Sequence, residues 1–165
     1  MNNPEINNET LSKSAQSVQD VLTKKGIAAR VVEMPASTRT AQEAAAAIGC
    51  EVAQIVKSLI FCTKQTNRPI LVLASGVNRV NEKAIAQHVG EEIGKADANF
   101  TREVTGFAIG GIPPIGHKQQ IETYIDQDLL KFKEVWAAAG TPNAVFNMDA
   151  VVLESLTGGK VISIT

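Results

Sequence analysis

Lys57 is the residue whose type and position most directly suggest chemistry. It lies in the apolar run I-V-K-S-L-I-F-C from Ile55 to Cys62, which is typical of a β-strand. Because side chains alternate along a strand, Lys57 is expected to face the same way as Ile55 and Phe61. An ammonium on an apolar face costs free energy unless it reaches water, a carboxylate or a ligand. Lys57 is therefore predicted either to orient a phosphate, carboxylate or carbonyl oxygen in a pocket, or to reach water near the strand end and guard against edge pairing.

A second candidate is the stretch from Thr105 to His117, T-G-F-A-I-G-G-I-P-P-I-G-H. Its prolines and glycines exclude a regular helix. The amides of Gly110 and Gly111 would serve a carbonyl or an oxyanion if they pointed into a cleft. The alternative is a kinked strand or bulge where two backbones cross. The stretch matches neither the dinucleotide-binding fingerprint nor the phosphate-binding loop.

Other catalytic machinery finds little support in the sequence. His117 follows the Gly/Pro stretch and is either a pocket residue or a structural one, whereas His88 is expected on the surface of a helix. The sequence contains no serine in a nucleophile elbow and no pair of acidic residues at a helix-facing spacing, so metal catalysis and a Ser-His-Asp triad are both disfavoured. We expect neither a metal nor a cofactor.

The charge balance limits the classes of partner. The 165 residues contain 16 basic and 17 acidic side chains, for a formal net charge of −1. A non-specific DNA binder or a polybasic membrane binder is thus disfavoured, whereas RNA contact through a local patch stays open. Five basic residues near the expected cleft are candidates for contact with a nucleic-acid backbone, with a solvated surface as the alternative for each: Arg39, Lys64, Arg68, Arg79 and Lys83.

Composition and hydropathy indicate where the protein resides. Cys50 and Cys62 have no partners at metal-ligand spacing and are expected to be buried free thiols. The N-terminus lacks the order of a signal peptide, and no apolar run is long enough to span a membrane. A cytoplasmic protein with no membrane contact is the expectation.

The elements expected around these residues make one domain. Residues 1–11 are predicted to be a flexible polar N-terminus, and residues 12–165 the folded domain. Thr40 is predicted to cap a helix through a capping box with Glu43, Asn81 to open another helix, and Asp149 to cap the last one. Helices are expected over 12–25, 40–48, 81–89 and 149–157, with a helical turn within 95–104. Strands are expected over 27–34, 55–63, 69–75, 121–125, 134–138, 144–148 and 161–164.

The connections between these elements predict a mixed sheet. The five-residue turn from Lys64 to Arg68 favours a hairpin between two strands. The second of them, Pro69 to Ser75, is apolar on both faces and is expected near the centre of a sheet covered on each side. The expectation is a mixed α/β (α+β) fold with about seven strands flanked by helices.

These pieces, in this order, resemble the YbaK family and the editing domain inserted in bacterial prolyl-tRNA synthetases. The similarity covers nearly the whole chain from about Ser12. It is carried by T-A-Q-E-A-A (40–45), Q-I-V-K-S-L-I-F (54–61), Gly76, T-G-F (105–107), G-G-I-P-P (110–114), Gly116 and A-G-T-P-N-A-V-F (139–146).

The resemblance implies a twisted, barrel-like mixed sheet and a hydrolase that removes a wrong amino acid from the 3′ end of tRNA. The typical substrate is Ala or Cys on tRNA specific for proline, so the implied partners are the aminoacylated 3′ end of tRNA and an aminoacyl-tRNA synthetase. In that family a positioned water, assisted by the substrate itself, replaces a protein nucleophile. Some members carry an acidic residue near the C-terminal pocket loop, where this chain has the neutral run 142–146.

The resemblance also implies a set of site residues. Lys57 falls on the family's lysine, which engages the region of the terminal adenosine, and 110–114 falls on the loop that holds the aminoacyl end. Lys57, Gly110 and Gly111 are the expected catalytic residues. The expected substrate-binding residues are Thr40, Phe61, Ile112, Pro113, Pro114, Gly116, His117 and Thr141. A module that binds a nucleotide or tRNA end without hydrolysis is the alternative function, and an interaction protein with no small-molecule site would leave Lys57 unexplained.

Overall fold

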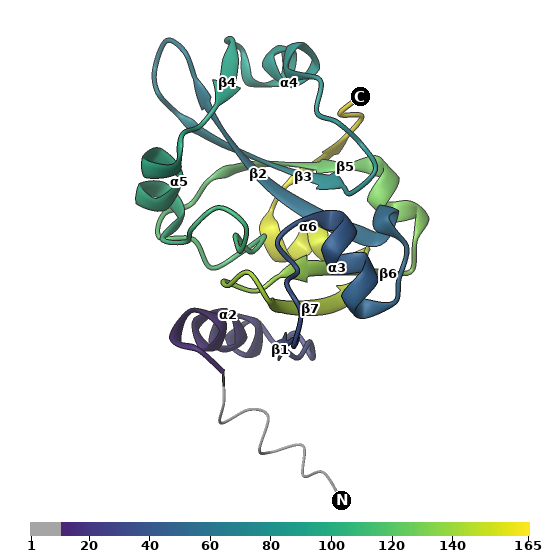
Figure 1. Cartoon of the computed structure of the whole chain (residues 1–165). Helices are drawn as coiled ribbons and strands as arrows, with labels where there is room; N and C mark the ends of the chain where they lie inside the picture. Colours follow the sequence, from purple (N-terminus) through teal and green to yellow (C-terminus); the bar gives the residue numbers. More distant parts are fainter. Residues whose placement is uncertain (1–10) are drawn as a thin grey trace, which may run out of the picture.

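Two long strands, β2 (Ile55–Thr63) and β3 (Pro69–Ser75), form the centre of the fold (Figure 1). They pair antiparallel from Val56↔Ser75 to Cys62↔Pro69, which confirms the predicted hairpin. Every residue from Ile70 to Ala74 is fully buried, so β3 is covered on both faces as expected. The computed structural model describes residues 11–165 of the chain.

The sheet around this hairpin is mixed and has eight strands, so the mixed α/β class is confirmed. Its order is β1 (Val32–Glu33), β7 (Ala144–Asp149), β6 (Glu134–Ala138), β2, β3, β5 (Glu122–Asp126) and β8 (Lys160–Ile162), and β4 (Ile93–Lys95) pairs with β2 beside this path. β6 runs parallel to β2, and β5 runs parallel to both β3 and β8, whereas the other pairs are antiparallel. Within residues 11–165 the sheet is open, with β1 and β8 at its ends.

Among residues 11–165, five helices and two short 3₁₀ segments surround the sheet. They are α2 (Lys13–Lys24), α3 (Ala41–Ile48), η1 (Val52–Gln54), α4 (Glu82–Val89), α5 (Ala98–Thr105), η2 (Gln127–Lys131) and α6 (Val152–Thr157). The capping box of Thr40 with Glu43 is present, and the Asn81 side chain accepts from the first turn of α4, as predicted. In Figure 1, α2 lies beside β1 at one end of the molecule, and α4 and β4 lie at the other.

Alternation along β2 divides the core between its two faces. Val56 and Ile60 belong to the larger core, which also contains residues of α2, α6 and the Gly/Pro stretch. On the opposite face Ile55 packs against the alanines of α3, whereas Phe61 packs in a separate cluster with Ile85 of α4. Lys57 therefore lies on the face of β2 opposite the larger core, between the small cluster that contains Ile55 and the one that contains Phe61.

The prediction of a strand over 27–34 is wrong except at Val32–Glu33, which form β1. Gln19 of α2 takes the place of a neighbouring strand, because its Oε1 accepts from Val31 N at 2.8 Å and its Nε2 donates to Ala29 O at 3.2 Å. A long-range side-chain contact therefore satisfies backbone groups that a ladder would otherwise use.

Two further corrections concern the second half of the chain. The helical turn expected within 95–104 is a complete helix, α5, whose first turn is capped by Asp97 at 2.7 Å from Phe100 N, and it is preceded by the unpredicted strand β4. Asp149 does not cap the last helix. It ends β7, and α6 begins after Val151 with no side-chain cap.

Expectations about the N-terminus and the thiols have mixed outcomes. The segment expected to be flexible lies outside the described residues except for Leu11, which packs against the larger core. Cys50 and Cys62 are free thiols as expected, but both are half-buried rather than buried. In the described part of the chain, no helix has the length and apolar character that crossing a bilayer requires.

Candidate functional site

A gap in the sheet marks the candidate site. One edge of β2 pairs with β3 along most of its length, whereas the other edge pairs with β6 only at Ile55 and Val56 and with β4 only from Phe61 onward. Residues 57–60 lie between these two ladders. Ile60 O accepts from Ala96 N at 3.2 Å on this edge. Because main-chain groups alternate in direction along a strand, the N–H and C=O of Ser58 point to the same edge.

A cavity of about 440 Å³ lies at this gap. It is lined by Lys57 and Ser58 of β2, by Gly110 and Ile112 of the Gly/Pro stretch, and by Thr40 at the start of α3. The predicted neighbourhood of Lys57 and the Gly/Pro stretch is thus present as one shared cavity. The volume falls in the range of small-molecule sites.

A second cavity of about 580 Å³ adjoins the first. The two share the wall made by residues 57–59 together with Ile109 and Ile112. The second cavity also has Phe61 on its floor and three charged side chains around it: Arg79, Glu82 and Lys95. One elongated ligand could therefore occupy both cavities across Lys57.

Lys57 is held in a defined orientation. Its Nζ donates to the main-chain oxygen of Asn78 at 2.6 Å, and the side chain is half-buried. Burial lowers the pKa of the Lys57 ammonium, the negative charge of Asp126 opposes this change, and Arg79 adds to it. The ammonium is thus a fixed positive charge at the wall between the two cavities.

Gly110 and Gly111 have different surroundings. Gly110 has a φ of +100°, and a Cβ added there would lie 2.8 Å from Cγ of Arg39, so the arginine stem lies across this glycine. Within residues 11–165 the Gly110 N–H has no acceptor, whereas the Gly111 N–H donates to Ala108 O at 3.2 Å. Of the two amides expected to serve a ligand, only that of Gly110 is unengaged within the described chain.

Gly111 joins the Gly/Pro stretch to the turn after β6. Its carbonyl accepts from Gly140 N at 2.8 Å, and a Cβ added at Gly111 would lie 2.8 Å from backbone atoms of Thr141. The neighbouring Pro142 carbonyl accepts from Thr38 N at 2.7 Å. This turn thereby fixes the segment that carries Arg39 and Thr40 to the cavity.

The remaining predicted site residues lie in the later part of the Gly/Pro stretch and in the turn after β6. Pro113 and Pro114 are buried, Gly116 packs against Val21 of α2, and His117 Nε2 lies 2.7 Å from Pro113 O. Burial lowers the pKa of His117, and the contact with the Pro113 carbonyl opposes this change. Gly111, these four residues and Thr141 are not among the lining residues of either cavity in the described chain.

The five basic residues divide into two groups. Arg39 lines the first cavity and Arg79 the second. Lys64 pairs with Glu92 at 3.9 Å and Arg68 with Glu91 at 3.7 Å, away from both cavities, and Lys83 is exposed on α4. Sequence reasoning could not separate these groups, because local patterns do not show which basic residues lie next to a cavity that distant segments build.

The lining of the first cavity defines what chemistry it can perform. Among residues 11–165 no carboxylate, imidazole or thiol lines it, and no three His, Cys, Asp or Glu side chains are grouped as metal ligands would be. What it offers is positive charge from Lys57 and Arg39, the Gly110 amide and the hydroxyls of Thr40 and Ser58. Such a site can bind and polarise a carbonyl or phosphate.

Sequence reasoning missed three polar residues near Lys57. Ser58 Oγ is buried and lacks a hydrogen-bond partner in the described chain, which is uncommon for a buried hydroxyl. Asn78 supplies the carbonyl that holds Lys57, and the buried carboxylate of Asp126 accepts from the Asn78 side chain at 2.8 Å. The signal for Asp126 was its position at the end of an alternating strand, where an ionisable side chain follows buried ones.

This chain is similar to several known proteins. The family model described as the aminoacyl-tRNA editing domain matches residues 35–156. A solved structure described as a "putative trans-editing enzyme for prolyl tRNA synthetase" is 47% identical, covers 94% of this chain and 99% of its own, and superimposes with a TM-score of 0.89. YwhH of Bacillus subtilis is 30% identical over 90% of this chain and 94% of its own. The "Putative Cys-tRNA(Pro)/Cys-tRNA(Cys) deacylase EbsC" of Enterococcus faecalis is 25% identical over 76% of this chain and 77% of its own.

Proposed function

The chain belongs to the aminoacyl-tRNA editing domain family, and on this basis we propose that it is a trans-acting aminoacyl-tRNA deacylase. Its substrate is tRNA specific for proline that carries Ala or Cys, and its reaction is hydrolysis of the ester at the 3′-terminal ribose. The observation that carries this proposal is that Lys57 and Gly110 line one cavity. The names of the E. faecalis relative and of the solved trans-editing structure support the choice of tRNA.

The reaction needs little from the protein beyond positioning. A water attacks the ester carbonyl carbon, the bond from that carbon to the ribose oxygen breaks, and the ribose oxygen takes up a proton. An aminoacyl ester is already activated, so orientation and stabilisation of the oxyanion suffice. Gly110 N–H and the Lys57 ammonium supply that stabilisation, and the proton passes through a group of the substrate because the cavity lining offers no carboxylate or imidazole.

The two cavities receive different parts of the substrate. The first has several small side chains in its lining, among them Ala41, Ala44 and Ala138, and takes the amino acid. The second carries Arg79 and Lys95 and takes the terminal nucleoside with its phosphate. The size and shape of the first cavity then exclude the correct amino acid, as a second sieve does. A synthetase that releases the mischarged tRNA is the second partner.

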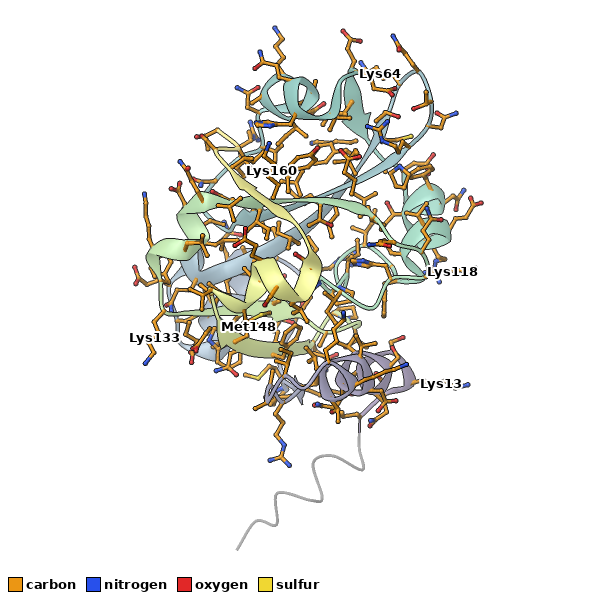
Figure 2. All side chains as sticks on the ribbon, turned by 180° about the vertical axis from the view of Figure 1, so that it is seen from behind. Lys13, Lys64, Lys118, Lys133, Met148 and Lys160 are labelled. Carbon is orange, nitrogen blue, oxygen red and sulfur yellow. The ribbon has the colours of Figure 1, made fainter. Side chains whose placement is uncertain are left out.

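The test is deacylation of tRNA specific for proline charged with Ala, Cys or Pro. The wild-type protein should release Ala or Cys and leave Pro in place. Lys57→Ala should lose activity on the order of 100-fold, the cost of removing one group that stabilises an oxyanion. Lys160→Ala is the matched control, because Lys160 is also a strand lysine but lies exposed in β8 at the end of the sheet (Figure 2).

A non-catalytic module that binds a tRNA end is the second candidate function. The observation that favours it is the lack of any proton-transfer side chain among the described residues that line the first cavity. Binding of charged tRNA that depends on Lys57, with ester loss no faster than in buffer on all three substrates, would establish the module and reject the deacylase.

A further inference from the structure

The orientation of Lys57 depends on one main-chain carbonyl. A lysine side chain has a flexible four-carbon stem, so its ammonium occupies many positions unless an acceptor selects one. The acceptor is Asn78 O at 2.6 Å from Nζ. A displacement of the turn that carries Asn78 would therefore displace the Lys57 ammonium as well.

That turn follows β3 and spans Ser75 to Asn78. Asn78 N donates to Ser75 O at 3.0 Å, which closes a four-residue turn. Ser75 Oγ donates to Ala53 O at 2.8 Å, and a Cβ added at Gly76 would lie 2.3 Å from Val52 O, so the turn lies directly against η1. Its first half is fixed by this contact, whereas its last residue needs another anchor.

Asp126 is that anchor, together with Asp128, whose Oδ2 also accepts from Asn78 Nδ2 at 2.8 Å. Asp126 is 1% exposed and ends β5, which runs parallel to β3, so the carboxyl ends of the two strands lie side by side. Its Oδ2 accepts from Ser75 N at 2.9 Å and from Asn78 Nδ2 at 2.8 Å, and its Oδ1 accepts from Asp128 N at 2.9 Å. A carboxylate that accepts three N–H donors has strong, charge-assisted hydrogen bonds. One buried side chain therefore holds both ends of the turn.

We infer that Asp126 is a positioning residue for Lys57, acting through the Ser75–Asn78 turn to fix the ammonium at the wall between the two cavities. This inference rests on the proposed role of Lys57 in the deacylase. Asp126 does not line either cavity within the described chain, so its contribution reaches the substrate only through Lys57.

Asp126 also acts on Lys57 by its charge. Its carboxylate raises the pKa of the ammonium against the larger effect of burial, while Arg79 lowers it. The other charged groups at the two cavities are Arg39 ahead of α3, Glu82 of α4 and Lys95 of β4. Loss of the Asp126 charge should therefore move the titration of Lys57 to lower pH.

The test is Asp126→Asn, which keeps the volume but replaces one accepting oxygen with a donating amide, so at least one of the three donors loses its acceptor. We expect kcat for deacylation to fall by about 10- to 100-fold, the scale of a misplaced catalytic group. KM should change little. The NMR titration of Lys57 Cε, assigned with Lys57→Met, should move to lower pH. Asp149→Asn removes an exposed carboxylate at the end of β7 and should change neither readout.

Two further measurements decide the inference whatever the first variant does. If Asp126→Asn fails to fold, Asn78→Ala removes the side chain that links the turn to Asp126 and Asp128 but keeps the Asp126 charge, and it should lower kcat with little change in KM. In a Lys57→Arg background, Asp126→Asn should cost less activity than in the wild type, because both changes act on one group. An unchanged Lys57 titration in folded Asp126→Asn, or an unchanged kcat in folded Asn78→Ala, overturns the inference. The titration needs no turnover, so it is decided separately from the deacylase proposal.

Discussion

Gly111 lies directly against the main chain of Thr141. A Cβ added at Gly111 would stand 2.8 Å from both the nitrogen and the carbonyl carbon of Thr141, and Gly111 O accepts from Gly140 N at 2.8 Å. Two loops far apart in sequence meet here without an intervening side chain. Only glycine at position 111 permits the two backbones to approach this closely, directly beside Gly110 and Ile112 of the first cavity's lining.

Gly111→Ala should therefore destabilise the protein by about 1–3 kcal/mol, the usual cost of overpacking a site that cannot relax. Urea unfolding measures the effect. Gly94→Ala is the control, because a Cβ at Gly94 meets only the flexible end of Lys64 at 3.5 Å. Equal stabilities of the two variants would mean that the contact with Thr141 yields without cost.

Gly110→Ala should separate backbone strain from cavity chemistry. Gly110 and Gly90 have similar positive φ values, +100° and +94°, so an alanine at either position costs about 1–2 kcal/mol. Only at Gly110 would the new methyl group displace the Arg39 side chain from the cavity. We expect similar losses of stability and a loss of deacylation in Gly110→Ala alone. Full activity in that variant would contradict the assigned role of this glycine.

Ser58→Ala should uncouple stability from activity. The buried hydroxyl of Ser58 has no partner in the described chain, so its removal breaks no hydrogen bond and should change the free energy of unfolding by less than about 0.5 kcal/mol. Deacylation should fall, because we expect the substrate to supply the missing partner. In the control Ser75→Ala, the lost hydrogen bond to Ala53 O should cost about 1 kcal/mol. A Ser58→Ala variant with wild-type kinetics would leave the hydroxyl without a role.

His117 should make stability depend on pH. Burial lowers its folded-state pKa below the ordinary value of 6.5, so the unfolded chain binds a proton that the folded chain does not. Between the lowered pKa and 6.5, the free energy of unfolding should rise with pH, and this contribution is lost as pH falls through that window.

Denaturant unfolding between about pH 5 and about pH 7.5 measures this slope. His117→Gln should flatten it, because the substitution removes the group whose pKa differs between the folded and unfolded chain. Parallel curves for wild type and His117→Gln would show that the histidine titrates alike in both states.

Local patterns in the sequence determined a large part of the fold. Strand alternation correctly placed Lys57 on the face of Ile55 and Phe61, and the apolar run of β3 indicated burial on both faces. The capping box at Thr40 and the cap at Asn81 also follow from nearest neighbours. Each of these features depends on residues a few positions apart, so the sequence alone is enough to predict it.

Features that depend on distant partners were decided only by the tertiary structure. Residues 27–31 read as a strand but are bonded by Gln19 of α2, and β4 exists because it pairs with β2. The gap between β4 and β6, the contact of Arg39 with Gly110 and the link from Asp126 to Lys57 likewise join residues from separate elements. Such contacts form only when the tertiary fold brings segments distant in sequence together, and a local sequence pattern does not determine which segments these are. The sequence therefore identified Lys57 and the Gly/Pro stretch, and the packing of distant segments decided that they share one cavity.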